Sequence, residues 1–251
     1  MTTPQRDGMP SCRHAGTPVA CRHGHSTPHR SKTPGDGHRR RRTPALALAT
    51  RGEVMTPRKT VAVVNLKGGV GKTTAALLIS TQLANLGHTV TVLDMDTQGS
   101  ATDWARIADE DGAPLPFEVR PANHASLRSY KQTADFTVID TPPTDPSVVD
   151  AAVKVADLII VPTPPGFMDT DRAWSTVEVT ASQVPTYVLL SRFDGRTNDA
   201  ADFASLLDER GVGRFETVIP ASVSIGRLRG TVPDPSKFRF DDLTTELLEV
   251  L

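Results

Sequence analysis

The sequence predicts an α/β protein: a doubly wound, mostly parallel sheet with helices on both faces. Short apolar runs rich in β-branched residues alternate with longer stretches of helical spacing. The apolar runs are continuous, as expected of parallel strands that are buried on both faces. This alternation occupies residues 59–251, a comfortable length for one domain with its own core.

Each apolar run is expected to form a strand, and each amphipathic stretch a helix. The first strand, 61–66, is followed by a helix over 73–86, which Gly87 is placed to end. The other expected strands are 89–94, 117–120, 136–140, 158–161, 187–190 and 215–219, and the other expected helices are 100–108, 146–155, 169–182, 199–210 and 241–250. The sequence contains no internal repeat.

The N-terminal segment differs from the rest in composition. Residues 1–59 hold 12 of the 28 Lys and Arg residues and 3 of the 29 Asp and Glu residues, so their charge is about +9 and that of the remainder about −10. Too few apolar residues are present to offset the entropy cost of ordering, so we interpret 1–58 as a disordered basic tail. An organelle transit peptide and a mis-called start, with Met55 as the true first residue, stay open.

The positions of the cysteines and the lengths of the apolar stretches limit the class of protein further. Both cysteines lie in the tail, so the folded part has no disulfide, which suits the cytosol. The motifs Cys12-Arg-His14 and Cys21-Arg-His23-Gly-His25 fit no familiar zinc spacing. No stretch approaches the roughly 18 apolar residues that a membrane helix needs.

Residues 67–74, Lys-Gly-Gly-Val-Gly-Lys-Thr-Thr, lie between the first strand and the first helix. The glycines let the backbone wrap closely around phosphate oxygens, and the helix adds its N-terminal dipole. Lys72 supplies a positive charge near the β- and γ-phosphates, and the Thr73 hydroxyl is placed to ligate Mg²⁺. The loop therefore predicts binding of Mg-ATP by Lys67, Gly68, Gly69, Val70, Gly71, Lys72, Thr73 and Thr74.

One position departs from the common pattern G-x-x-x-x-G-K-[ST]. Leu66 stands where glycine is usual, and Lys67 follows it. The variant K-G-G-x-G-K-[ST] resembles the deviant Walker A loop of the ParA/MinD family of ATPases. In that family the first lysine reaches the partner's phosphates across an ATP-sandwiched dimer, so the resemblance implies an ATP-dependent homodimer in which Lys67 is catalytic in trans, like an arginine finger. A solvated loop lysine is the alternative for Lys67.

Two acidic segments are expected to meet the loop at the carboxyl ends of strands. Asp94-Met-Asp96-Thr-Gln-Gly-Ser100 resembles the family's D-x-D-P-Q-G-S switch segment, with Thr97 in place of proline, and the resemblance implies that Asp96 orients the attacking water. Such an acidic pair is otherwise often a helix N-cap or a metal shell. Asp140 ends a later strand, as in a Walker B motif, where the carboxylate holds Mg²⁺ opposite Thr73. The expected metal ligands are Thr73, Asp140 and Asp96.

Two further segments are assigned by the resemblance to the nucleotide base. Val161-Pro-Thr-Pro-Pro165 stands where the family has a proline-containing loop beside the adenine, so Pro162 is expected there. Ser191-Arg192 stands where the family often has an asparagine that binds the base, which places Arg192 near the nucleotide. Because the asparagine is missing, the choice of ATP over GTP depends mostly on the resemblance.

The resemblance covers about Thr60 to Leu251 and is nearest to the small plasmid- and chromosome-partitioning ParA proteins. It implies an ATPase that dimerises on ATP, binds DNA non-specifically, and hydrolyses ATP when a small centromere-binding, ParB-like partner stimulates it. Its place would be the cytoplasm, on the nucleoid or a plasmid. A MinD-like ATPase for another cargo and a P-loop biosynthetic ligase stay open. The acidic polar face of 241–251 argues against membrane binding.

DNA binding needs clustered cations, and the domain is net acidic. Candidates for DNA contact are Arg192, Arg196, Arg214, Arg227, Arg229, Lys237 and Arg239. Scattered arginines are more often solvated surface. The cluster Arg39–Arg42 in the tail could add affinity through counterion release.

Overall fold

The structure, a computed structural model, describes residues 58–143, 145–165 and 171–251. These residues form a seven-stranded sheet in the order β3-β2-β4-β1-β5-β6-β7, and every described strand pair is parallel. The predicted fold class is confirmed. The proposed disordered tail, its Cys and His motifs and Arg39–Arg42 lie outside the described residues.

The elements follow the predicted alternation of strands and helices. The strands are β1 (Lys59–Val63), β2 (Val90–Asp94), β3 (Glu118–Pro121), β4 (Phe136–Asp140), β5 (Leu158–Thr163), β6 (Thr186–Phe193) and β7 (Ile219–Pro220). The α-helices are α1 (Lys72–Asn85), α2 (Ser100–Glu110), α3 (His124–Ser129), α4 (Pro146–Val153), α5 (Asp171–Ala181), α6 (Asp199–Glu209) and α7 (Phe240–Val250). Two 3₁₀ turns, η1 (Ile225–Arg227) and η2 (Pro235–Phe238), precede α7.

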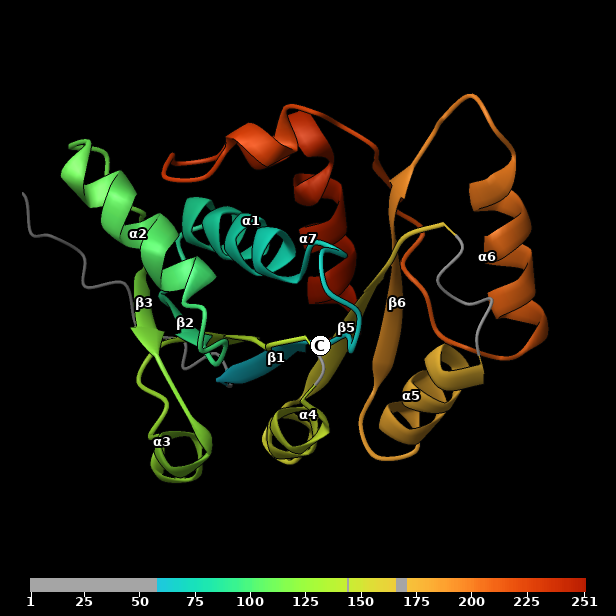
Figure 1. The fold of residues 1–251 in the computed structure, drawn as a ribbon, viewed down its shortest axis with the longest axis horizontal. Coiled ribbons are helices and arrows are strands. Elements are labelled where there is room, and N and C mark those ends of the chain that lie inside the picture. Colours follow the sequence, from blue (N-terminus) through green and yellow to red (C-terminus); the bar gives the residue numbers. More distant parts are fainter. Residues whose placement is uncertain (1–57, 144, 166–170) are drawn as a thin grey trace, which may run out of the picture. The chain divides into compact units, whose positions relative to one another are not determined.

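Helices cover both faces of the sheet. Figure 1 shows α1, α2 and α7 on one face and α3, α4 and α5 on the other. Along β1, Val61 and Val63 pack into the core under the first group, while Ala62 packs into the core that also holds residues of α4, α5 and α6. Side chains alternate between the faces of a strand, so a strand covered on both faces is buried along its length and is mainly apolar. The continuous apolar runs are explained by this burial.

Glycine ends α1, as the sequence predicts. Gly87 has a left-handed φ of 91°. Its N–H donates to the Ala84 carbonyl oxygen at 2.9 Å, and the His88 N–H donates to the Leu83 carbonyl oxygen at 3.1 Å. These two hydrogen bonds close the last turn in a Schellman motif, which needs a left-handed residue at this place.

Several predicted boundaries were wrong, and one short helix was missed. Strands β5 and β6 extend to Thr163 and Phe193 rather than to 161 and 190, and α2 extends to Glu110 rather than to 108. Strand β1 ends at Val63 rather than at 66, because the chain turns there into the phosphate loop. Strand β7 covers only Ile219–Pro220 rather than 215–219, and α4 ends at Val153 rather than at 155. Helix α3 has six residues, of which only Leu127 is buried, so it has no apolar periodicity to detect.

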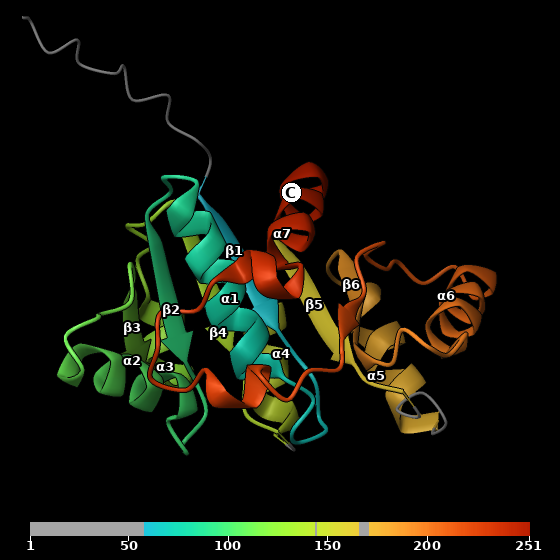
Figure 2. The same cartoon turned by 90° about the horizontal axis from the view of Figure 1, so that it is seen from above.

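The segment between β7 and α7 crosses α1 toward α2 and then returns, as Figure 2 shows. The Trp104 indole N–H on α2 donates to the Thr231 carbonyl oxygen at 2.7 Å. The Arg229 guanidinium pairs with Asp103 of α2 at 2.9 Å. A segment late in the sequence is thereby fixed beside the helix that follows the predicted switch residues. Within the described residues, no helix is long and apolar enough to cross a membrane.

Candidate nucleotide-binding site

Sheet order brings the three predicted motifs together. Strand β4 lies between β1 and β2, so Asp140 at its end is level with Val63 on one side and Asp94 on the other. The Thr141 hydroxyl donates to the Val63 carbonyl oxygen at 2.9 Å, which holds the two strand ends together. The carboxyl ends of these strands therefore form one site, at the edge of the sheet where ligands bind in doubly wound folds.

The phosphate loop owes its shape to glycine conformations. Gly69 and Gly71 have φ angles of 72° and 97°, in the left-handed region that L side chains rarely adopt. A Cβ atom at either position would meet nothing within 4 Å. The requirement for glycine is therefore conformational at both positions, and a side chain would strain the backbone. Gly71 leads directly into α1, whose first turn carries unpaired N–H groups suited to an anion.

Lys72 is buried beside the loop that it is predicted to serve. Its ammonium donates a hydrogen bond to the Lys67 carbonyl oxygen at 3.1 Å. Burial lowers the pKa of Lys72, and the negative charges of Asp140 and Asp96 oppose that effect. A cation in such surroundings interacts strongly with an anion that enters the site, because little water is present to screen it.

Asp140 is fully buried, and neither of its carboxylate oxygens has a hydrogen-bond partner among the described residues. Burial raises the pKa of Asp140 to about 7, and the charge of Asp94 adds to this effect. The Thr73 hydroxyl and Lys72 act in the opposite direction, although Thr73 makes no hydrogen bond of ordinary geometry with the carboxylate. An unsatisfied buried carboxylate beside a hydroxyl fits a divalent cation.

Protein groups would supply only part of a metal coordination shell here. The described part of the chain has no cluster of three or more His, Cys, Asp or Glu side chains that could hold a metal. Magnesium usually keeps several waters and takes its remaining ligands from one or two carboxylates and from substrate phosphates. Thr73 and Asp140 therefore suit Mg²⁺ that arrives with a nucleotide.

The two aspartates of the predicted switch segment have different roles. Asp94 accepts hydrogen bonds at 2.8 Å from both the N–H and the hydroxyl of Thr102, and at 3.1 Å from the Asp96 N–H. Asp94 thus holds the first turn of α2 through Thr102, although the N-cap residue of this helix is Gly99. Asp96 is half-buried, and its carboxylate accepts the Gln98 N–H at 2.9 Å. Of the two, Asp96 is the one that lines a cavity with Lys72.

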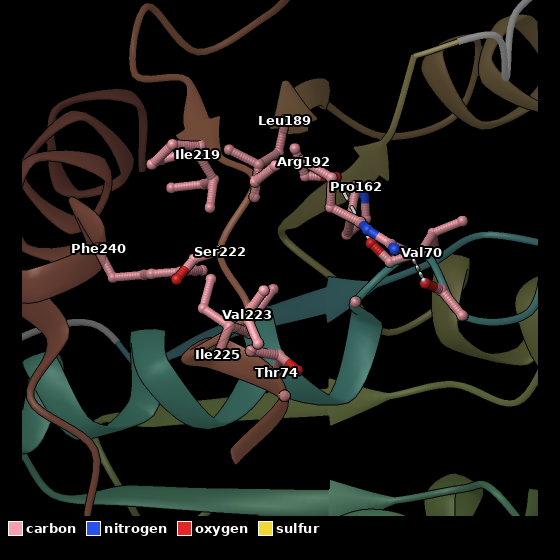
Figure 3. A pocket seen from close by; sticks show the side chains of 17 residues that line it. Val70, Thr74, Pro162, Leu189, Arg192, Ile219, Ser222, Val223, Ile225 and Phe240 are labelled. Carbon is pink, nitrogen blue, oxygen red and sulfur yellow. Dashed lines mark hydrogen bonds between the residues drawn. The ribbon is translucent and has the colours of Figure 1, made fainter. Parts of the chain in front are cut away.

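Two cavities flank the phosphate loop. One, of about 360 Å³, is lined by Lys72, Thr73, Asp96 and other polar groups. The other, of about 540 Å³, is largely apolar, and Figure 3 shows Pro162, Leu189, Val223 and Ile225 around it. Gly69, Gly71 and Thr74 line both cavities. The arrangement suits a ligand with an anionic chain in one cavity and a flat, apolar group in the other.

Pro162 and Arg192, the two residues predicted beside the nucleotide base, both line the apolar cavity (Figure 3). The Arg192 guanidinium donates to the Gly69 carbonyl oxygen at 2.8 Å. Arg192 also has a φ of 62°, a left-handed conformation that costs a non-glycine residue about 1 kcal/mol. Such local strain is found most often at functional sites. Arg192 therefore braces the phosphate loop from the end of β6.

Sequence reasoning missed one residue that shapes the loop. Asn65 is fully buried, donates to the Pro162 carbonyl oxygen at 2.8 Å and accepts the Lys67 N–H at 2.8 Å. It joins the start of the phosphate loop to the end of β5. The available signal was a single polar residue inside the apolar run 61–66.

The candidates for DNA contact differ in their surroundings. Arg214 has only 15% of its side chain exposed and pairs with Asp208 and Glu216 at 2.9 Å, which makes it the poorest candidate. Among the candidates that form ion pairs, Arg196 is the most accessible, because 89% of its side chain is exposed. Its partner is Asp194. The remaining candidates, Arg192, Arg227, Arg229, Lys237 and Arg239, are all exposed.

The fold and this site define a P-loop nucleotide-binding protein, and comparison with known proteins supports the assignment. Residues 61–231 match the family described as the CobQ/CobB/MinD/ParA nucleotide binding domain. The maintenance of carboxysome distribution protein A of Gloeobacter kilaueensis is 38% identical over 170 residues, which are 65% of this chain and 77% of that protein. The chromosome-partitioning ATPase Soj of Thermus thermophilus is 28% identical over 204 residues, covering 66% of this chain and 82% of its own.

A solved structure shows the same fold. It is a plasmid partition protein of Borrelia burgdorferi B31 bound to AMPPNP, with a TM-score of 0.62 and 17% identity over 77% of this chain and 100% of that one. This chain belongs to the ParA/MinD family, whose members are P-loop ATPases, and its relatives are partition and positioning ATPases. The resemblance predicted from the sequence is confirmed.

Proposed function

We propose that this protein is a positioning or partitioning ATPase that forms a dimer on binding ATP and completes each active site with Lys67 of the other protomer. The observation that carries the proposal is the contrast between the two loop lysines. Lys72 is buried inside its own site, whereas Lys67 is exposed. The Lys67 N–H and carbonyl oxygen are held by hydrogen bonds with Asn65 and Lys72, so the exposed side chain is carried on a fixed backbone. A cation held in this way suits delivery to a second copy of the chain.

The residues have separate roles in the proposed reaction. Lys72 and the N–H groups of the loop bind the phosphates of ATP, and Thr73 and Asp140 hold Mg²⁺. A Mg²⁺ ion held by these two side chains would neutralise negative charge on the phosphates. The Asp96 carboxylate accepts a hydrogen bond from the attacking water and orients it toward the γ-phosphorus. Lys67 of the second protomer stabilises the charge that develops in the transition state.

The apolar cavity is the proposed place of the adenine ring. Pro162, Leu189 and Ile225 offer apolar surface from three segments of the chain. Arg192 lies at the same cavity, where its planar guanidinium is suited to stacking on a base. The residues that line both cavities support a base site next to the phosphate loop.

Non-specific DNA and a small ParB-like, centromere-binding protein are the proposed partners, and the cytoplasmic nucleoid or a plasmid is the proposed location. Partition proteins among the relatives support this proposal. The C-terminal helix supports a function without membrane binding. Its apolar residues Phe240, Leu243 and Leu247 are buried in the core against α1, so they are not available to a lipid surface.

The test compares the two lysines in an ATPase assay with non-specific DNA and the partner protein. Lys67→Ala and Lys72→Ala should each abolish stimulated hydrolysis, and light scattering should show an ATP-dependent dimer for the wild type. Undiminished stimulated hydrolysis in both variants would refute the proposal. Lipid binding without DNA binding, measured by liposome pelleting with ATP, would favour a MinD-like function instead.

A further inference from the structure

A second cation lies at the phosphate-side cavity. Arg229, from the segment that crosses to α2, lines the cavity of about 360 Å³ together with Lys72, Thr73 and Asp96. Its side chain is 59% exposed and pairs with Asp103 of α2 at 2.9 Å. The roles proposed above make no use of this arginine.

The backbone that follows Arg229 packs tightly against α2. Gly230 is buried, and a Cβ atom there would lie 2.3 Å from Cγ2 of Ile107. Its φ of 77° also requires glycine. At Thr231, the carbonyl oxygen accepts the hydrogen bond from the buried Trp104. Arg229 thus extends from a fixed point beside the cavity, and its exposed side chain can change partner.

Asp103 has a second cationic neighbour besides Arg229. Arg106, one turn further along α2, lies 3.6 Å from the other carboxylate oxygen of Asp103. If Arg229 turned toward an anion in the cavity, Asp103 would keep a positive neighbour. An exposed ion pair is weak, so the exchange needs little free energy. A guanidinium can bind phosphate oxygens in a bidentate manner.

We propose that Arg229 binds the terminal phosphate of ATP within the same protomer, and gives up its ion pair with Asp103 to do so. The inference rests on the proposed ATP site. Because ADP lacks the terminal phosphate, Arg229 distinguishes the two nucleotides. The contact also links the nucleotide state to the segment between β7 and α7 and to α2, whose first residue, Ser100, ends the predicted switch segment.

The test measures the affinity for AMPPNP and for ADP, each with Mg²⁺, by calorimetry on the full chain. Arg229→Ala should weaken AMPPNP binding about tenfold or more and change ADP binding less than about twofold. Asp103→Ala should tighten AMPPNP binding, because Arg229 is then released from its competing partner. Arg120→Ala is the matched control: it removes an exposed arginine that pairs with Glu118 on β3 and does not line the cavity, and it should leave the preference between the two nucleotides unchanged.

The outcomes separate this inference from the proposed function. Equal weakening of both nucleotides by Arg229→Ala, or no effect on either, would overturn the role of Arg229 while leaving the ATP site in place. A wild-type protein that binds neither nucleotide would overturn both. Thermal unfolding of each variant checks that it is folded. If Arg229→Ala does not fold, Arg229→Lys and Asp103→Ala provide the test instead. Weaker AMPPNP binding by the Asp103→Ala variant would contradict the inference.

Discussion

The ammonium of Lys72 donates a hydrogen bond to the backbone carbonyl oxygen of Lys67, 3.1 Å away. The two lysines of one loop are therefore coupled through the backbone of Lys67, while their side chains lie in different surroundings. Lys72 is buried among carboxylates and Lys67 is exposed. Lys72 therefore lies within the site of its own protomer, whereas the exposed Lys67 is the residue that we propose acts on a second one.

This difference predicts separable effects on nucleotide binding. Lys72→Ala removes a buried, charged hydrogen-bond donor and should weaken binding of Mg-ATP by the monomer roughly 10- to 100-fold. Lys67→Ala should leave monomer affinity within about threefold, because the proposed role of this side chain is at the site of the other protomer. Calorimetry at protein concentrations below dimerisation measures both. Equal losses in the two variants would contradict the assignment.

Asp140 predicts a pH-dependent stability of the nucleotide-free protein. Burial raises the pKa of Asp140 from its ordinary value of 3.8 to about 7. The folded state then binds more protons than the unfolded state between these values, so the contribution of Asp140 to stability is present below pH 3.8 and is lost as the pH rises through 7. Asp140→Asn should raise the melting temperature at pH 8 and have little effect near pH 4. If the Asp140→Asn variant were less stable than the wild type at pH 8, the charged Asp140 carboxylate would have stabilising partners in the folded protein, which would contradict this account.

Replacing Arg192 by glycine should change thermal stability and nucleotide affinity in different directions. Arg192→Gly removes the strain at a φ of 62° and also the hydrogen bond to the Gly69 carbonyl oxygen. We expect an unchanged or higher melting temperature together with a several-fold loss of nucleotide affinity. Arg196→Gly is the control, since Arg196 is 89% exposed and pairs only locally with Asp194. Equal affinities of the Arg192→Gly variant and the wild type would show that the loop needs no brace from β6.

DNA binding should depend on the exposed arginines. Replacing Arg196 and Arg227 together by alanine should reduce the dependence of affinity on salt, with a change of about one in the logarithmic slope for each DNA phosphate that is no longer neutralised. Arg214→Ala is the control, because Arg214 is 15% exposed and holds two carboxylates. It should lower stability and leave the salt dependence unchanged. Fluorescence anisotropy over a range of salt concentrations measures the slopes, and an unchanged slope in the double variant would exclude both residues.

The fold was predictable because most elements carry strong local signals. The central strands β1, β2, β4 and β5 are buried at almost every position and are rich in apolar, β-branched residues, and Gly87 marks the end of α1. Weak signals failed where tertiary contacts decide the structure. Helix α3 buries one residue, and β7 is held to β6 by only a short pairing at its edge.

The site was predictable where its residues lie in contiguous motifs. Residues 67–74, Asp96 and Asp140 come together because β4 lies between β1 and β2, which the alternation of elements alone does not specify. Asn65 was visible only as a polar interruption of an apolar run. Arg229 carries no local signal, since its partner Asp103 is 126 residues away and its place depends on the packing of Gly230 on α2.

A mixing experiment tests most directly whether Lys67 acts in trans. Lys67→Ala and Asp96→Ala protomers should each be inactive in stimulated ATP hydrolysis when assayed alone. In a mixed dimer, the site that retains Asp96 receives an intact Lys67 from the other protomer, while the second site lacks both. An equal mixture should therefore recover about a quarter of wild-type activity, since half of the dimers are mixed and each has one working site. A mixture as inactive as its components would contradict a shared active site.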